Sequence, residues 1–99
     1  MIVFFRSASI APGKNAGAVK FANEVVAYLK DKYGVVMEVA IPIGGNPNRV
    51  GWTSRLESLA ALEAAQAKLH GDTKYAELIA KGADNYIAGS VHDVMWRIL

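Results

Sequence analysis

The residues of this sequence with the greatest capacity for proton chemistry are its two histidines. His92 is followed directly by Asp93, and a carboxylate beside a histidine can hold the imidazole in one tautomer and keep it poised near neutral pH. Successive residues of a strand point to opposite faces, so these two side chains need not meet. His70 precedes Gly71 in a helix-breaking turn, where a capping or solvated role is expected. Neither histidine identifies a catalytic residue.

The large aromatic side chains point to a binding pocket rather than to a reaction. Trp52, Tyr86 and Trp96 supply apolar area, and Arg6 supplies a fixed charge, which together are typical of a small-molecule site. Aromatic residues of a small domain also serve in its core or at an interface. We therefore take Arg6, Trp52, Tyr86, His92 and Trp96 as the candidate ligand-binding residues, and we name no catalytic residue.

The sequence contains no motif of a metal or nucleotide site. There is no cysteine, and the spacing of His70 and His92 matches no zinc or EF-hand pattern. Gly13-Lys14 lacks the earlier glycine and the following Ser or Thr of a phosphate-binding loop. We predict neither a metal site nor a cofactor.

Composition indicates one small domain. The chain has 99 residues, of which 53% are hydrophobic, enough for a single core with no evident linker, so one domain is expected over residues 1–99. Its 11 Lys and Arg residues against 9 Asp and Glu residues give a net charge of only +2, which does not indicate a nucleic-acid partner. The lack of cysteine, of a signal-peptide core and of a membrane-spanning apolar run predicts a cytoplasmic protein with no membrane partner.

The periodicity of the apolar residues predicts the order β, α, β, β, α, β. A change from period two to period 3.6 separates strands from helices, and Gly or Pro marks most boundaries. The expected strands and helical segments cover residues 2–8, 15–33, 35–43, 49–56, 58–82 and about 91 onward. Gly34 is expected to end the first helix, and Ser58 and Thr73 are expected to cap the two pieces of the second helical segment, which is interrupted at residues 70–72.

This order favours an α+β fold, the ferredoxin-like βαββαβ arrangement, in which a four-stranded antiparallel sheet carries both helical segments on one face. The other face is then uncovered. Yet residues 2–5 of the first strand and residues 94–98 of the last strand place apolar side chains on both sides. A monomer would leave a large apolar patch in water, so we expect a homodimer formed through the sheet.

Two segments carry a resemblance to known proteins. Arg6 is followed by Ile10-Ala11-Pro12-Gly13-Lys14 before the first helix, and residues 51–59 read GWTSRLESL from the third strand into the second helical segment. With the layout of nearly the whole chain, these segments resemble the dimeric α/β-barrel superfamily, and more narrowly its NIPSNAP-like and antibiotic-biosynthesis-monooxygenase-like members. The resemblance implies a homodimer whose sheets face one another as a barrel, with a small-molecule cavity between sheet and helices in many members.

The resemblance also implies a class of function. Haem-degrading members use an Asn on the first strand together with a His and a Trp, whereas this first strand offers Arg6 and Ser7, with His70 and Trp52 as the counterparts of the other two. What is implied instead is a cofactor-free, monooxygenase-like protein that binds or transforms a small hydrophobic or aromatic molecule. The alternative is a non-catalytic homodimeric interaction module.

RNA binding is a third class, because the RRM shares this topology and length. An RRM stacks bases on alternating aromatic residues of its third strand. Residues 49–56 supply a single aromatic side chain, Trp52, so no nucleic-acid partner is predicted.

Overall fold

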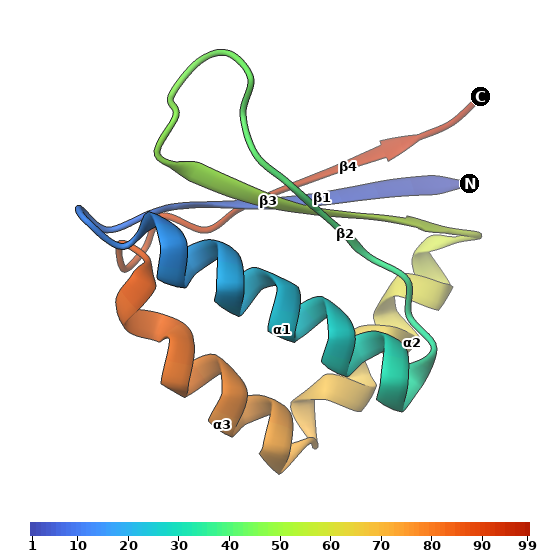
Figure 1. Ribbon diagram of the computed structural model, residues 1–99. Coiled ribbons are helices and arrows are strands. Elements are labelled where there is room, and N and C mark those ends of the chain that lie inside the picture. The colour runs from blue at the N-terminus through green and yellow to red at the C-terminus, as the bar shows by residue number, and fades with distance from the viewer.

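The computed structural model describes all residues, 1–99, and contains one four-stranded sheet with helices on one side of it (Figure 1). Its elements, in chain order, are β1 (Ile2–Ser9), α1 (Asn15–Tyr33), β2 (Glu38–Ala40), β3 (Arg49–Leu56), α2 (Leu59–His70), α3 (Thr73–Gly82), the 3₁₀ turn η1 (Ala83–Asn85) and β4 (His92–Arg97). The predicted order and the predicted α+β, ferredoxin-like class are confirmed.

The sheet has the strand order β2-β3-β1-β4, and every neighbouring pair is antiparallel. In this register Phe4 of β1 lies between Ser54 of β3 and Met95 of β4. Residues directly opposite one another share a face, so the register determines which side chains meet the helices. The longest strands, β1 and β3, occupy the centre, and β2 and β4 form the edges.

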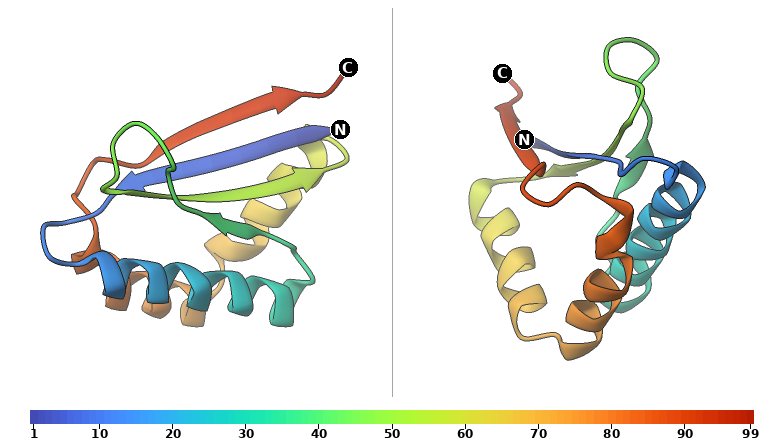
Figure 2. Two further views of the ribbon diagram at one scale, coloured as in Figure 1. Left: turned by 45° about the horizontal axis from the view of Figure 1, so that its top comes forward. Right: turned by 90° about the vertical axis from the view of Figure 1, so that its left-hand side faces the viewer.

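The second strand is shorter than the prediction of residues 35–43. Only Glu38–Ala40 pair with β3, because Pro42 has no backbone N–H to donate to the ladder. The preceding residues leave the sheet, although the carbonyl of Val36 still accepts a hydrogen bond of 2.9 Å from the Ser54 hydroxyl. The chain from residue 41 to 48 forms a loop that rises on the side of the sheet opposite the helices (Figures 1 and 2).

The helix boundaries follow from side-chain capping, with one correction. Gly34 adopts a left-handed conformation (φ 67°) after α1, and Ser58 accepts from the backbone N–H of Ala61 at the start of α2, as predicted. Thr73, however, does not cap α3. The cap is Asp72, whose carboxylate accepts from the backbone N–H of Tyr75 at 3.0 Å. A carboxylate is also the favoured group at a helix N-terminus, because its charge complements the helix dipole.

Helix α1 packs closely on the sheet through small residues. Ala18 and Ala22 are completely buried there and contact a cluster that contains Val50 and Trp52. A second cluster lies between α1 and the other helices and is built on Phe21, Val25 and Leu29. Steps of three and four along the sequence predict an apolar stripe of Val19, Ala22, Val26, Leu29 and Tyr33. The buried residues are instead Ala18, Phe21, Ala22, Val25 and Leu29, so the stripe is rotated by about one residue. None of the helices combines the length and the hydrophobicity that a membrane-spanning helix needs.

The side of the sheet away from the helices is the open face. Its central part is apolar, because Val3 and Phe5 of β1 lie opposite Trp96 and Val94 of β4. Trp96 is 68% exposed. Phe5 lies over Gly51 of β3, where an added Cβ would come within 2.4 Å of the ring, so only glycine fits beneath it. The open face consists of Val3, Phe5, Ser7, Ser9, Arg49, Gly51, Thr53, Arg55, His92, Val94 and Trp96.

Asp72 also joins the two helices that meet at the far end of the molecule. Its second carboxylate oxygen, Oδ2, accepts hydrogen bonds from the hydroxyls of Tyr28 and Tyr33, each at 2.6 Å, and from Nζ of Lys32 at 2.9 Å. The carboxylate is buried, and all three donors belong to the last turns of α1. Because a buried charge is tolerated only when it is paired and hydrogen-bonded, this cluster fixes the start of α3 against the end of α1.

We predict that replacing Asp72 with Asn weakens this junction in a pH-dependent way. Hydrogen bonds from Tyr28 and Tyr33 hold the pKa of Asp72 far below its ordinary value. Its contribution to stability is therefore complete above the unfolded-state pKa of about 4 and is lost as the pH falls toward the lower folded-state pKa. Asp72→Asn should melt several degrees below the wild type at pH 7, and the gap should narrow between about pH 5 and about pH 3 in thermal melts followed by circular dichroism.

The control is Asp31→Asn, which removes an exposed carboxylate of α1 that makes no hydrogen bond or ion pair. This variant should melt within about 1 °C of the wild type at each pH. A difference between Asp72→Asn and wild type that does not change with pH would contradict a role for the charge.

Candidate ligand-binding site

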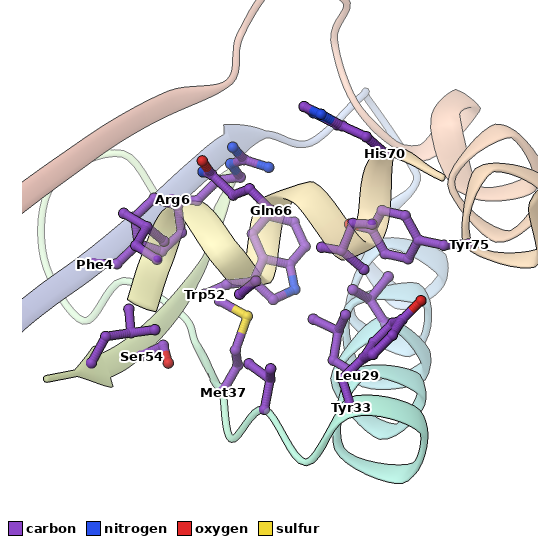
Figure 3. Close-up of a pocket in the computed structure, with 16 residues that line it drawn as sticks. Phe4, Arg6, Leu29, Tyr33, Met37, Trp52, Ser54, Gln66, His70 and Tyr75 are labelled. Carbon is purple, nitrogen blue, oxygen red and sulfur yellow. The ribbon is translucent and has the colours of Figure 1, made fainter. Parts of the chain in front are cut away.

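A cavity of about 330 Å³ lies between the sheet and the helices (Figure 3). Its volume is at the lower end of the range of about 300–1,000 Å³ found for small-molecule sites. Of the 16 residues that line this sheet–helix cavity, 12 are hydrophobic. Those on which the site depends are Phe4, Arg6 and Trp52 from the sheet, Leu29 from α1, Gln66 and His70 from α2, and Tyr75 from α3.

The cavity exists because α2 does not pack flat on the sheet. Leu62 is the only buried residue of this helix, and Leu59 in its first turn is 45% exposed. Helix α2 ends at Gly71, after which α3 turns back along α1. Figure 2 (right) shows α2 descending along one side of the molecule and α1 with α3 along the other. The space enclosed between these two sides and the sheet is the cavity.

Trp52 forms a fixed wall of the cavity. Its indole is 8% exposed, and Nε1 points to the backbone carbonyl of Ala22 at 3.5 Å, the outer limit of a hydrogen bond. Behind it lies Tyr86, with ring centroids 5.9 Å apart and planes at 56°. The hydroxyl of Tyr86 donates to the carbonyl of Ala18 at 2.6 Å, and burial raises the pKa of this tyrosine to about 12. The indole is therefore held between helix and core and presents its remaining surface to the cavity.

Three of the polar lining residues lie near the mouth of the cavity, whereas Ser54 is buried. Arg6 has a side chain 40% exposed, and its Nε and Nη2 donate to the two carboxylate oxygens of Asp93 at 2.7 and 2.8 Å. Gln66 and His70 follow one another at one-turn spacing on α2, and Figure 3 shows Arg6 beside Gln66 with His70 at the rim of the same side. Tyr75 enters from α3. The side chains of Gln66, His70 and Tyr75 make no hydrogen bond to another protein group, so they are available to a bound molecule.

The electrostatics of the mouth are dominated by the Arg6–Asp93 pair. The hydrogen bond from Arg6 lowers the pKa of Asp93, and the same bond raises the pKa of Arg6, so both groups stay charged near neutral pH. Burial raises the pKa of Tyr75, which keeps its hydroxyl protonated. No group of three or more His, Asp and Glu side chains is placed to hold a metal ion.

The structure places the five candidate residues in three different locations. Arg6 and Trp52 come together in the cavity, and Tyr86 lies directly behind Trp52 in the core. His92 and Trp96 lie on the open face, opposite Ser7 and Val3 of β1. The alternation of β4 thus separates His92 from Asp93, as expected from the sequence, and Asp93 binds Arg6 instead.

Sequence reasoning missed several residues of the cavity. Phe4, Gln66 and Tyr75 line it, and Asp93 forms an ion pair with Arg6 at its mouth. Gln66 could have been found, because it lies one turn before His70 on the same face of the helix. Asp93 could not, since its pairing with Arg6 depends on the register of two strands that are distant in sequence.

Comparison with known proteins identifies the fold. No protein-family model matches the sequence, and no curated protein matches it. Solved structures do: a NIPSNAP domain protein from Burkholderia xenovorans is 15% identical, with a TM-score of 0.84 over 100% of this chain and 95% of that one. A NIPSNAP family protein from Agrobacterium tumefaciens is 19% identical, with a TM-score of 0.83 over 99% of this chain and 85% of that one.

A third similar structure is a candidate antibiotic biosynthesis monooxygenase from Deinococcus radiodurans. It is 12% identical, with a TM-score of 0.71 over 99% of this chain and 92% of that one. At such low identities the likeness concerns the fold and leaves the activity to be argued from the site. The chain has the ferredoxin-like α+β fold of NIPSNAP and antibiotic-biosynthesis-monooxygenase-like proteins, which confirms the resemblance found in its sequence.

Proposed function

We propose that this protein binds a small, largely apolar or aromatic molecule in the sheet–helix cavity. The observation that supports this most strongly is a cavity of about 330 Å³ in which 12 of 16 lining residues are hydrophobic. The cavity opens to solvent at its mouth, and a concave, mostly apolar space with a few polar groups is the usual form of a small-molecule site. The unpaired polar groups of Gln66 and Tyr75 would orient that molecule, while Phe4 and Trp52 contact its apolar body.

Few groups of the cavity are free to take part in a reaction. The hydroxyl of Tyr33 is bound to Asp72, and the carboxylate of Asp93 is bound to Arg6. Burial raises the pKa of Tyr75, so its hydroxyl stays protonated near neutral pH and does not act as a general base. Removal of a proton from a bound phenol would therefore fall to His70.

The likeness to the candidate monooxygenase makes oxidation by O₂ the reaction class to test. The assay is oxygen uptake with a dihydroxynaphthalene, measured against the rate without protein. If the wild type takes up oxygen faster than the protein-free control and His70→Gln does not, the protein is a catalyst as well as a binding protein. If the rates with and without wild-type protein are equal, the protein binds the molecule without oxidising it.

The apolar open face supports a homodimer. Val3, Phe5, Val94 and Trp96 form a continuous apolar group there. The 41–48 loop, which rises on the same side in Figure 1, carries the fully exposed Ile43. Soluble proteins rarely leave such patches uncovered, and a two-fold contact between identical faces would bury both copies of the patch. This face also supports the alternative function, a non-catalytic homodimeric interaction module, and binding of a ligand in the cavity distinguishes the two.

The cavity is tested by filling it. Ala65 lines the cavity from α2, whereas the preceding residue, Ala64, is exposed on the same helix. We expect the neutral fluorescent probe N-phenyl-1-naphthylamine to bind the wild type, Ala65→Phe to bind it about tenfold or more weakly, and Ala64→Phe to bind within about twofold of the wild type. Titrations followed by probe fluorescence measure all three. Equal binding by the two variants would place the probe outside the cavity and contradict the proposal.

The dimer is tested on β4. Trp96 points to the open face and its neighbour Met95 to the side of the helices, and both are more than half exposed, at 68% and 53%. We expect the wild type to sediment as a dimer and Trp96→Glu to shift toward the monomer, because a carboxylate in an apolar interface must be desolvated without a partner. Met95→Glu should remain dimeric in the same sedimentation-velocity experiment. A monomeric wild type would refute the homodimer.

A further inference from the structure

The Arg6–Asp93 ion pair limits the kind of polar group that the cavity can accept. A lone arginine at the mouth of an apolar cavity would favour a carboxylate or a phosphate, because guanidinium binds both in a bidentate manner. Here that binding geometry is already occupied. Nε and Nη2 of Arg6 donate to the two oxygens of Asp93, so the charge of the arginine is compensated within the protein.

Apart from His70, the polar groups that remain on the cavity are uncharged or have their charge compensated, and most of them are hydrogen-bond donors. A guanidinium has five N–H groups, and Asp93 accepts two of them, which leaves those of Nη1 and one of Nη2. The protonated hydroxyl of Tyr75 and the amide of Gln66 lie on the same cavity and have no partner in the protein. Figure 3 shows Arg6 and Gln66 beside each other on one side of the cavity, next to Trp52. These groups match an oxygen that accepts hydrogen bonds.

The charge of Asp93 acts against an anionic ligand. A carboxylate placed within reach of the free N–H groups of Arg6 would also lie close to the Asp93 carboxylate, and it would have to leave water to enter a mostly apolar cavity. A ketone, a quinone-type carbonyl or a phenolic oxygen carries no such cost. Repulsion of the wrong ligand is as effective a source of specificity as attraction of the right one.

We propose that the sheet–helix cavity selects uncharged molecules, with an apolar ring body against Phe4 and Trp52 and a hydrogen-bond-accepting oxygen held by Arg6, Gln66 and Tyr75, and that Asp93 excludes the corresponding carboxylates. This inference rests on the proposed function of ligand binding in the same cavity. It adds the chemical class of the ligand and assigns Asp93 as the residue that determines specificity.

The test compares three probes of similar size that differ in one substituent: 2-acetylnaphthalene, 2-naphthoate and 2-ethylnaphthalene. Each is measured by its displacement of N-phenyl-1-naphthylamine from the wild type at pH 7. The ketone should bind about tenfold or more tightly than the carboxylate, and also more tightly than the hydrocarbon, because hydrogen bonds to a charged group contribute more than neutral ones. A carboxylate that binds as tightly as the ketone would overturn the inference.

The variant Asp93→Asn tests the cause of the selectivity. It leaves Arg6 uncompensated, so the affinity for 2-naphthoate should rise about tenfold while that for 2-acetylnaphthalene changes by less than about threefold. Asp31→Asn changes the net charge equally but lies on the exposed side of α1, and it should leave the preference unchanged. A rise in naphthoate affinity in both variants would show an effect of net charge alone and would also overturn the inference.

The outcomes separate this inference from the proposed function. If the fluorescent probe does not bind the wild type, the cavity is not a ligand site and both fail. If the probe binds in the cavity but the three naphthalenes show no preference for the ketone, ligand binding stands and the assignment of ligand class fails. Should Asp93→Asn not fold, the wild-type comparison of ketone and carboxylate still decides.

Discussion

The sheet carries apolar side chains on both faces, but the helices cover only one of them, and this imbalance determines how the other elements are arranged. The adjacent residues Phe4 and Phe5 show the constraint: strand alternation sends Phe4 into the cavity and Phe5 onto the open face over Gly51. The side that faces the helices is covered within the chain, because the small residues Ala18 and Ala22 let α1 lie directly on β2 and β3. The open face has no such cover within the chain, and this uncovered apolar surface is the basis of the proposed homodimer.

The cavity is a consequence of how the chain returns from β3 to β4. An unbroken helix could not follow both the sheet and α1, and the break at Gly71 lets α3 turn onto α1 while α2 stands away from the strands. The direction of α3 is set at both ends. Asp72 binds its first turn to α1, and near its other end Gly82 lies so close to the ring of Phe21 that an added Cβ would come within 2.1 Å. The Asp72 junction and the Gly82–Phe21 approach thus fix the wall of the cavity formed by α1 and α3. Helix α2, which leads directly into α3, forms the opposite wall.

The sequence was sufficient for the order of elements, the antiparallel sheet and most helix ends, because these follow from local periodicity and capping chemistry. The stripe of α1 was predicted one residue out of phase, since Phe21 and Val25 are buried by residues of α2 and α3, whose positions no local pattern reveals. Arg6 and Trp52 lie together because they are paired residues of the two central strands and face the helices, a register that the sequence alone left open. The contribution of α2 to the site, and Asp93 as the partner of Arg6, depend on tertiary packing and strand register, which composition does not encode.

The Arg6–Asp93 pair connects the two surfaces that carry the proposed functions. It joins β4 to β1 on the side of the helices. The two neighbours of Asp93 in the same strand, His92 and Val94, point to the open face. Strand β4 is an edge strand that pairs with β1 alone. Its position therefore depends on this ion pair on the side of the helices and on the proposed partner subunit on the open face. A partner subunit seated on Val94 would hold Asp93 against Arg6 and so maintain the compensated charge at the mouth of the cavity. In the proposed dimer, subunit association and the proposed ligand selectivity would therefore be coupled through the six residues of β4.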